Sequence, residues 1–153
     1  MKILTSRFGE IEVEDSAVVD MPAGVIGFPG RQRYVIIRHS PESPFYWFQA
    51  ADQSDLAFVI VDPKVFMPDY EVPMPKALLD VLGAESQEQL SVFVIITIPE
   101  GRPDAMTANL LGPLVVNPIA KLARQIVLDD RRYSHRHPIM KKSADPQSDS
   151  TSE

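Results

Sequence analysis

Short apolar segments separated by glycine and proline are the feature of this sequence that most restricts its fold. The 153 residues include 14 prolines and 7 glycines, which recur between the apolar segments. Proline lacks a backbone N–H donor and glycine adopts turn conformations easily, so both mark the ends of regular elements. Most of the segments between them are rich in β-branched and aromatic residues, which favour strands. The sequence therefore predicts many short strands.

Alternation of charged and apolar residues predicts an N-terminal hairpin. Glu10, Glu12 and Glu14 alternate with Ile11 and Val13, a period of two that is typical of a half-buried strand. Composition and turn residues predict the other strands at residues 2–5, 17–20, 34–38, 45–49, 56–61 and 90–98, with two or three more between residues 106 and 133. Short strands interrupted so regularly are typical of a sandwich or a barrel.

One helix is expected, between Pro75 and Leu82. Proline suits the first turn of a helix, Leu78 and Val81 lie on one face with Leu82, and Gly83 follows as a stop signal. Because the sequence predicts one helix and many strands, it predicts an all-β fold. We expect a single, mainly antiparallel, barrel-like domain with one or two short helices.

The expected domain covers residues 1–139, a length that can bury one core. Residues 140–153 are polar and charged, so we expect them to form a disordered tail. The residues expected in the core are Ile95, Ile98, Leu110, Val115, Ile126 and Leu128.

The charge balance argues against nucleic acid as a direct partner. Fifteen Lys and Arg stand against 21 Asp and Glu, a net charge of −6. Nucleic-acid binders gain much of their affinity from basic residues, so we expect no direct nucleic-acid binding and favour a basic protein partner. The sequence contains no cysteine, no long apolar run and no apparent signal peptide. We therefore expect a cytoplasmic protein without a membrane span.

Catalytic and metal-binding patterns are not apparent in the sequence. It contains no nucleophile elbow, no HExxH motif and no glycine-rich phosphate loop, so we expect neither an enzyme nor a cofactor. His135 and His137 lie on one side of an extended chain, as a metal pair could. The neighbouring Arg131, Arg132 and Arg136 would repel a cation, so a solvated basic segment is the favoured interpretation. A hydrolase-like enzyme using either histidine is the alternative.

Several motifs, in a characteristic order, resemble one known family. Residues 108–117 read Ala-Asn-Leu-Leu-Gly-Pro-Leu-Val-Val-Asn, followed by Arg124–Leu128 and Tyr133. The upstream motifs are Phe8–Glu10, Gly24–Phe28, Phe48–Gln49, Leu56–Pro63 and Val92–Pro99. Over about residues 1–139, this order closely resembles the FliW family of flagellar assembly factors.

The resemblance implies a small cytoplasmic β-barrel-like protein that acts by binding, without catalysis or a cofactor, and that is a monomer when free. Members of the family bind newly made flagellin and also CsrA, an RNA-binding translational repressor. The resemblance implies that the free protein holds CsrA away from flagellin mRNA. Flagellin that accumulates then captures the protein, and the released CsrA represses flagellin synthesis.

Two kinds of surface are expected to meet these partners. Acidic loops are expected to meet the basic parts of CsrA, because opposite charges favour encounter; these loops carry Asp52, Asp55, Asp69 and Glu71. Flagellin is expected to need an apolar groove, since amphipathic segments dock in such grooves. The residues expected to line it are Phe48, Leu110 and Val116.

Four amide side chains are further candidates for partner contacts. Asn109 and Asn117 lie beside glycine and proline, where an asparagine side chain closes turns, and we favour this structural role. Gln125 either satisfies buried backbone or lines a groove, and both interpretations stay open. Gln49 follows an aromatic run at residues 45–48, in which alternation places one aromatic pair in the core and the other on a partner-binding surface.

Overall fold

The computed structural model describes residues 1–38 and 40–139, so the expected tail at 140–153 lies outside the described residues. The strands are β1 (Lys2–Thr5), β2 (Gly9–Glu12), β3 (Val18–Asp20), β4 (Arg33–Arg38), β5 (Phe45–Ala50), β6 (Ala57–Val61), β7 (Ser91–Thr97), β8 (Thr107–Ala108), β9 (Leu114–Asn117), β10 (Leu122–Gln125) and β11 (His137–Pro138). The helix is α1 (Lys76–Val81), and the short 3-10 helices are η1 (Asp15–Ala17), η2 (Pro63–Val65), η3 (Gln87–Gln89) and η4 (Pro103–Ala105).

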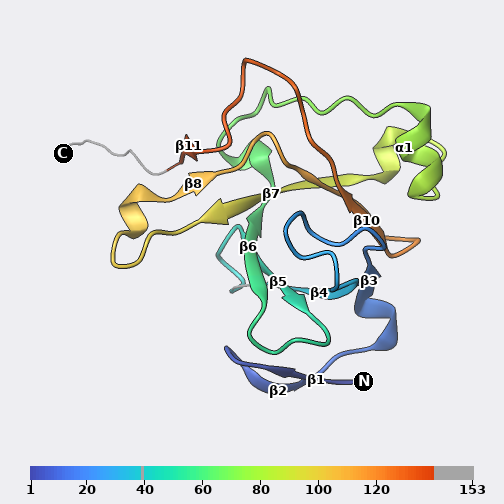
Figure 1. Ribbon diagram of the computed structural model, residues 1–153, viewed down its shortest axis with the longest axis vertical. Helices are drawn as coiled ribbons and strands as arrows, with labels where there is room; N and C mark the ends of the chain where they lie inside the picture. The colour runs from blue at the N-terminus through green and yellow to red at the C-terminus, as the bar shows by residue number, and fades with distance from the viewer. Residues whose placement is uncertain (39, 140–153) are drawn as a thin grey trace.

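Seven strands close into a barrel in the order β7-β6-β5-β4-β3-β10-β9, with β9 returning to pair with β7 (Figure 1). Ser91 to Phe93 of β7 pair with β9, and the second half of β7 pairs with β6 on one side and β8 on the other. The pairs are antiparallel except for β3 with β10, which meet in parallel at Asp20 and Leu122. The predicted all-β, mainly antiparallel, barrel-like fold is confirmed.

Aromatic and aliphatic side chains fill the barrel. Tyr34 and Phe48 stack face to face, with ring centroids 4.4 Å apart, beside Ile60, Leu114 and Val116. Offset or edge contacts between aromatic rings typically add about 0.5–1.5 kcal/mol to area burial. Of the aromatic run at residues 45–48, Tyr46 and Phe48 belong to this inner cluster.

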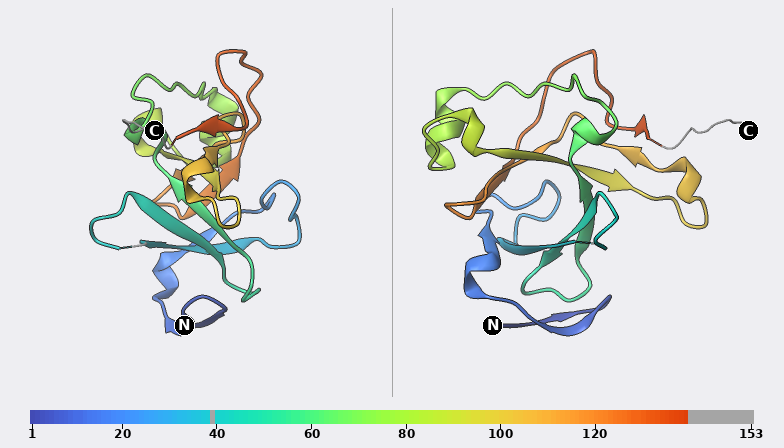
Figure 2. Two further views of the ribbon diagram at one scale, coloured as in Figure 1. Left: turned by 90° about the vertical axis from the view of Figure 1, so that its left-hand side faces the viewer. Right: turned by 180° about the vertical axis from the view of Figure 1, so that it is seen from behind.

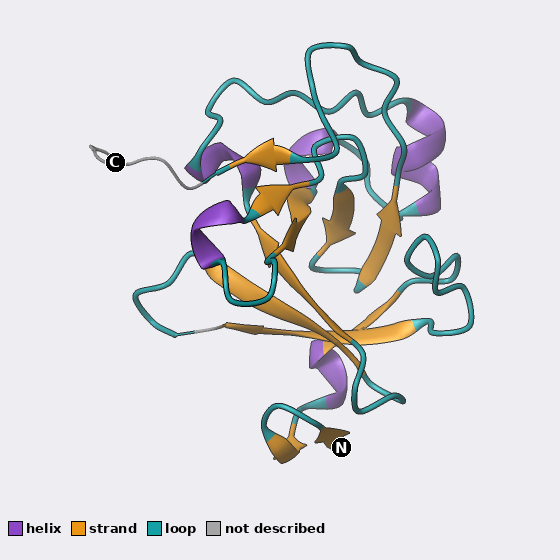
Figure 3. Ribbon diagram, turned by 60° about the vertical axis from the view of Figure 1, so that its left-hand side comes forward, coloured by secondary structure: helices purple, strands orange, loops and turns teal. Residues whose placement is uncertain are grey.

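Two further clusters form on the outside of the barrel, where chain segments cover its strands. In one, the segment around Tyr70 packs on β7 and β8, and the Tyr70 hydroxyl donates a 2.6 Å hydrogen bond to the Leu110 carbonyl. Burial raises the pKa of Tyr70 far above its ordinary value, so the hydroxyl remains a donor. In the other, α1 packs against Val115 of β9 through Leu78 and Leu82. Figure 3 shows the helices, in purple, at the periphery of the strands.

The predicted N-terminal hairpin is confirmed as β1 paired with β2, and it lies beside the barrel (Figures 1 and 2). Ile3 is buried, and Phe8 meets Trp47 of β5 edge to face, with ring centroids 6.2 Å apart. The Arg7 guanidinium lies 4.0 Å from the centroid of the same indole ring. Ser6 N–H donates a 2.8 Å hydrogen bond to the Ser54 carbonyl. Side-chain packing on Trp47 and a backbone hydrogen bond therefore both hold the hairpin against the barrel.

Local signals also located the helix and most of the core. Helix α1 lies within the predicted range, and Gly83, at φ +68°, ends it. Leu110, Val115 and Leu128 are buried as predicted, while Ile95 and Ile126 are partly buried against the clusters. The prediction that Ile98 is a core residue is wrong, because β7 ends at Thr97 and the side chain is 43% exposed.

Leu110 and Ile98 therefore make a matched test of the core. Leu110→Ala should lower the free energy of unfolding by about 2–5 kcal/mol, because the fully buried side chain leaves a cavity. Ile98→Ala should change it by less than about 0.5 kcal/mol, as exposed positions usually do. Urea unfolding followed by far-UV circular dichroism measures both, and equal losses would contradict this assignment of the core.

Candidate partner-binding surfaces

The three residues expected to line an apolar groove lie inside the molecule instead. Phe48, Leu110 and Val116 are buried, so they present no surface to a partner in this conformation. Both faces of β9 are covered, because Leu114 and Val116 point into the barrel cluster while Val115 packs against α1. The groove predicted from these residues is therefore corrected to core packing.

Two of the four candidate amides are buried and bonded to backbone. The Gln49 Nε2 lies within hydrogen-bond distance, 3.1–3.3 Å, of four carbonyl oxygens at and around the β5–β6 loop, those of Ala50, Gln53, Ser54 and Leu56. The Asn117 Nδ2 donates a 2.8 Å hydrogen bond to the Leu82 carbonyl, while its Oδ1 accepts from the N–H groups of Ile119 and Ala120. The structural interpretation of Asn117 is confirmed, and Gln49 orders a loop.

Asn109 and Gln125 converge on Gly112. The Asn109 Oδ1 accepts a 3.0 Å hydrogen bond from Leu111 N–H, which closes the turn and confirms its structural role. The Gln125 Nε2 donates to the Gly112 carbonyl at 2.9 Å, and its Oε1 accepts from Ile26 N–H at 2.8 Å. Gln125 thus joins two loops through their backbone, which is the first of its two interpretations.

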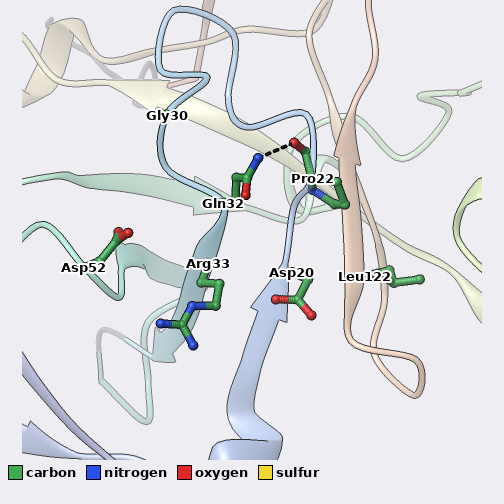
Figure 4. A pocket seen from close by; sticks show the side chains of 7 residues that line it. All are labelled: Asp20, Pro22, Gly30, Gln32, Arg33, Asp52 and Leu122. Carbon is green, nitrogen blue, oxygen red and sulfur yellow. Dashed lines mark hydrogen bonds between the residues drawn. The ribbon is translucent and has the colours of Figure 1, made fainter.

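The candidate acids lie on two separate loops. Asp52 and Asp55 belong to the exposed β5–β6 loop, where Asp52 lies 3.9 Å from the Arg31 guanidinium. Asp52 also lines a small cleft of about 350 Å³ (Figure 4). In that view Arg33 lies between Asp52 and Asp20, so the lining of the cleft mixes both signs of charge. So small a cleft gives a partner little surface to bury.

A larger groove combines an apolar floor with an acidic rim; we term it the acidic groove. It encloses about 880 Å³ beside the start of β7, between the segments around residues 70–74 and 130–132. Its apolar lining includes the partly buried Tyr46, Val72, Met74, Leu90, Val92 and Phe93. Its charged lining consists of the acids Asp62, Glu71, Glu88 and Asp130 and the cations Lys64 and Arg132. Of the candidate acids, only Glu71 lines it.

Arg132 holds two of these acids together. Its Nη2 lies 2.8 Å from Asp130 Oδ2, its Nε donates to Asp130 Oδ1 at 3.1 Å, and its Nη1 lies 3.5 Å from Glu71 Oε1. The hydrogen bonds from Arg132 lower the pKa of Asp130 below its ordinary value. The Arg132 side chain is 61% exposed, so solvent screens the network.

The sequence reasoning missed most of the acidic groove. Val72 and Met74 lie in the proline-rich segment at residues 63–75, for which the sequence predicted no regular element. Their alternation with Pro73 and Pro75 was a signal for an extended segment with one apolar side. Glu88 belongs to η3 and Asp130 to the segment after β10, and no local pattern joins them.

The described residues carry neither a metal cluster nor a membrane helix. No group of three or more His, Asp or Glu that could hold a metal ion is found in residues 1–38 and 40–139. His137 stacks on Phe66 with ring centroids 5.8 Å apart, while His135 is exposed. Within the same residues, no helix is long and apolar enough to cross a membrane.

The fold and the acidic groove define a small β-barrel protein with a surface groove suited to binding a partner. The model of the FliW protein family matches residues 2–139. Flagellar assembly factor FliW of Treponema denticola is 39% identical over 141 residues, covering 92% of this chain and 94% of the relative. That of Geotalea uraniireducens is 38% identical over 149 residues, covering 97% and 90%.

The solved structures agree with the sequence comparisons. A crystal structure of the flagellar assembly factor FliW superposes with a TM-score of 0.84, at 28% identity, and covers 94% of this chain and 100% of that chain. The chain therefore belongs to the FliW family of flagellar assembly factors, whose members are non-catalytic. The hydrolase-like alternative using His135 or His137 is thereby set aside.

Gly112→Ala tests the convergence of the two amides. A Cβ at Gly112 would lie 2.9 Å from both Asn109 Nδ2 and Gln125 Nε2, so these hydrogen-bonded amides would have to move. We expect a loss of about 1–3 kcal/mol in the free energy of unfolding. Gly30→Ala, where a Cβ meets nothing within 4 Å, is the matched control. The loss should shrink in a Gln125→Ala background, and strict additivity would contradict the proposed clash.

Proposed function

We propose that this chain binds flagellin and the translational regulator CsrA in turn, as a monomer in the cytoplasm when free. Bound to CsrA, it prevents repression of flagellin mRNA; flagellin that accumulates captures it and releases CsrA. The acidic groove is the observation that carries the proposal, because it offers burial and negative charge at one place. An RNA-binding protein must be basic to hold phosphates, so its charge complements this chain, whose net charge is −6.

The exposed acids Asp52, Asp55, Asp69 and Glu71 remain our proposed contacts for the basic partner. The exposed acids act through long-range attraction, which raises association rates and weakens as salt rises. Phe48, Leu110, Val116, Gln49 and Asn117 act only indirectly in this proposal, because they hold the barrel and its loops in place. Asn109 and Gln125 hold the turn around Gly112 in the same way.

A gel-shift titration tests whether the protein acts on translation without touching the message. The protein alone should leave a flagellin leader RNA unshifted at physiological salt, because its net negative charge opposes phosphate binding. The same protein should reverse the shift that CsrA causes, and added flagellin should restore that shift. Direct binding to the RNA, or failure to reverse the shift, would refute the proposal.

A further inference from the structure

We infer that the acidic groove is the docking site for a basic, amphipathic segment of the RNA-binding partner; this inference rests on the proposed function. The groove offers two complementary features at one place. Half-buried apolar side chains form its floor, and four carboxylates against two cations form its charged lining. An occupant must therefore carry apolar side chains for the floor and Lys or Arg for the rim.

The size of the acidic groove limits the occupant to a segment of chain. Its volume of about 880 Å³ accommodates several side chains but not a folded domain. The floor combines Val72, Met74 and Leu90 with the first residues of β7, so apolar area comes from several separate segments. Amphipathic segments bind such grooves by inserting a row of apolar side chains, with charged residues left at the rim.

The charges of the acidic groove select a basic occupant. Glu88 is exposed and has no hydrogen bond or ion pair with the described residues, so its charge is available to a partner. Asp62 Oδ1 accepts a 2.9 Å hydrogen bond from Lys64 N–H at the start of η2, and Asp62 lies among the charged residues that line the groove. An RNA-binding partner carries the Lys and Arg that suit these acids, because it must also hold phosphates. An acidic or nucleic-acid occupant would be repelled.

Arg132 already occupies part of this acidic rim. It pairs with Asp130 and Glu71, and so acts as an internal cation that competes with a partner's cation. If the acidic groove takes a basic segment, removing Arg132 should free two carboxylates and tighten binding. A purely structural role for the same side chain would weaken binding instead. The sign of the effect therefore separates electrostatic docking from general stabilisation.

Two matched pairs of variants test the inference by calorimetric titration with purified CsrA. Glu88→Lys should weaken binding about three- to tenfold, while Glu100→Lys, an equal charge reversal at an exposed turn outside the groove, should have little effect. Arg132→Gln should tighten binding about two- to fivefold, because two carboxylates become available. Arg102→Gln removes the same charge from an exposed Arg–Asp pair outside the groove and should change little.

A third pair tests the apolar floor. Met74→Glu should weaken CsrA binding by at least about tenfold, because a floor residue is lost and a carboxylate must be buried. Ile119→Glu, at a turn residue that is 86% exposed, is the control. Far-UV circular dichroism verifies that each variant folds, and Glu88→Lys tests the groove without altering the floor.

Each outcome decides the inference. Stronger effects of the groove variants than of their controls, with opposite signs for Glu88→Lys and Arg132→Gln, would support it. Equal effects of groove and control variants on CsrA, or effects on flagellin binding alone, would overturn the docking site and leave the proposed function intact. Absence of CsrA binding by the wild-type protein would overturn both.

Discussion

Closure of the barrel through β7 is the constraint on which the rest of the structure depends. The first half of β7 pairs with β9, through Ser91, Val92 and Phe93, and its second half leaves β9 and continues with β8. Elsewhere in the barrel the pairing between β3 and β10 is short, because these two strands share only one parallel residue pair. β7 pairs with β6, β8 and β9. Its outward apolar side chains are covered by segments from elsewhere in the chain. The segments that follow β6 and β10 supply this cover (Figure 1).

The acidic groove follows from that arrangement. It opens where β7 begins, because the covering segments around residues 70–74 and 130–132 approach each other there without filling the space. Contacts between these segments fix its walls: Tyr70 and Tyr133 pack with ring centroids 4.7 Å apart, and Glu71 N–H donates to the Tyr133 hydroxyl. The groove is therefore supported by the same packing that closes the molecule, which limits the ordering cost of binding.

Local patterns in the sequence predicted the strands, the helix and the turn role of the asparagines, because each depends on residues close in sequence. The closure of the barrel could not be predicted in this way, since β7 and β9 pair across a long intervening segment. The prediction that Val116 lines a surface groove failed for a related reason. A period of two shows that Val116 points away from Val115, but not that a second layer covers both faces of β9. The acidic groove was missed because its lining comes from segments far apart in sequence.

The exposed charges and the apolar floor have different physical roles in the proposed exchange of partners. Solvent screens the rim acids, so each exposed ion pair contributes at most about 1 kcal/mol to affinity. Their larger effect is on the rate of encounter and on the exclusion of RNA, because like charges repel. Residence time must then come from apolar burial, and the half-buried apolar side chains of the groove, such as Val92 and Phe93, offer only a limited area for it. A modest floor under a rim with an excess of acids favours rapid binding of a basic partner and leaves it displaceable, which is what an exchange between two partners requires.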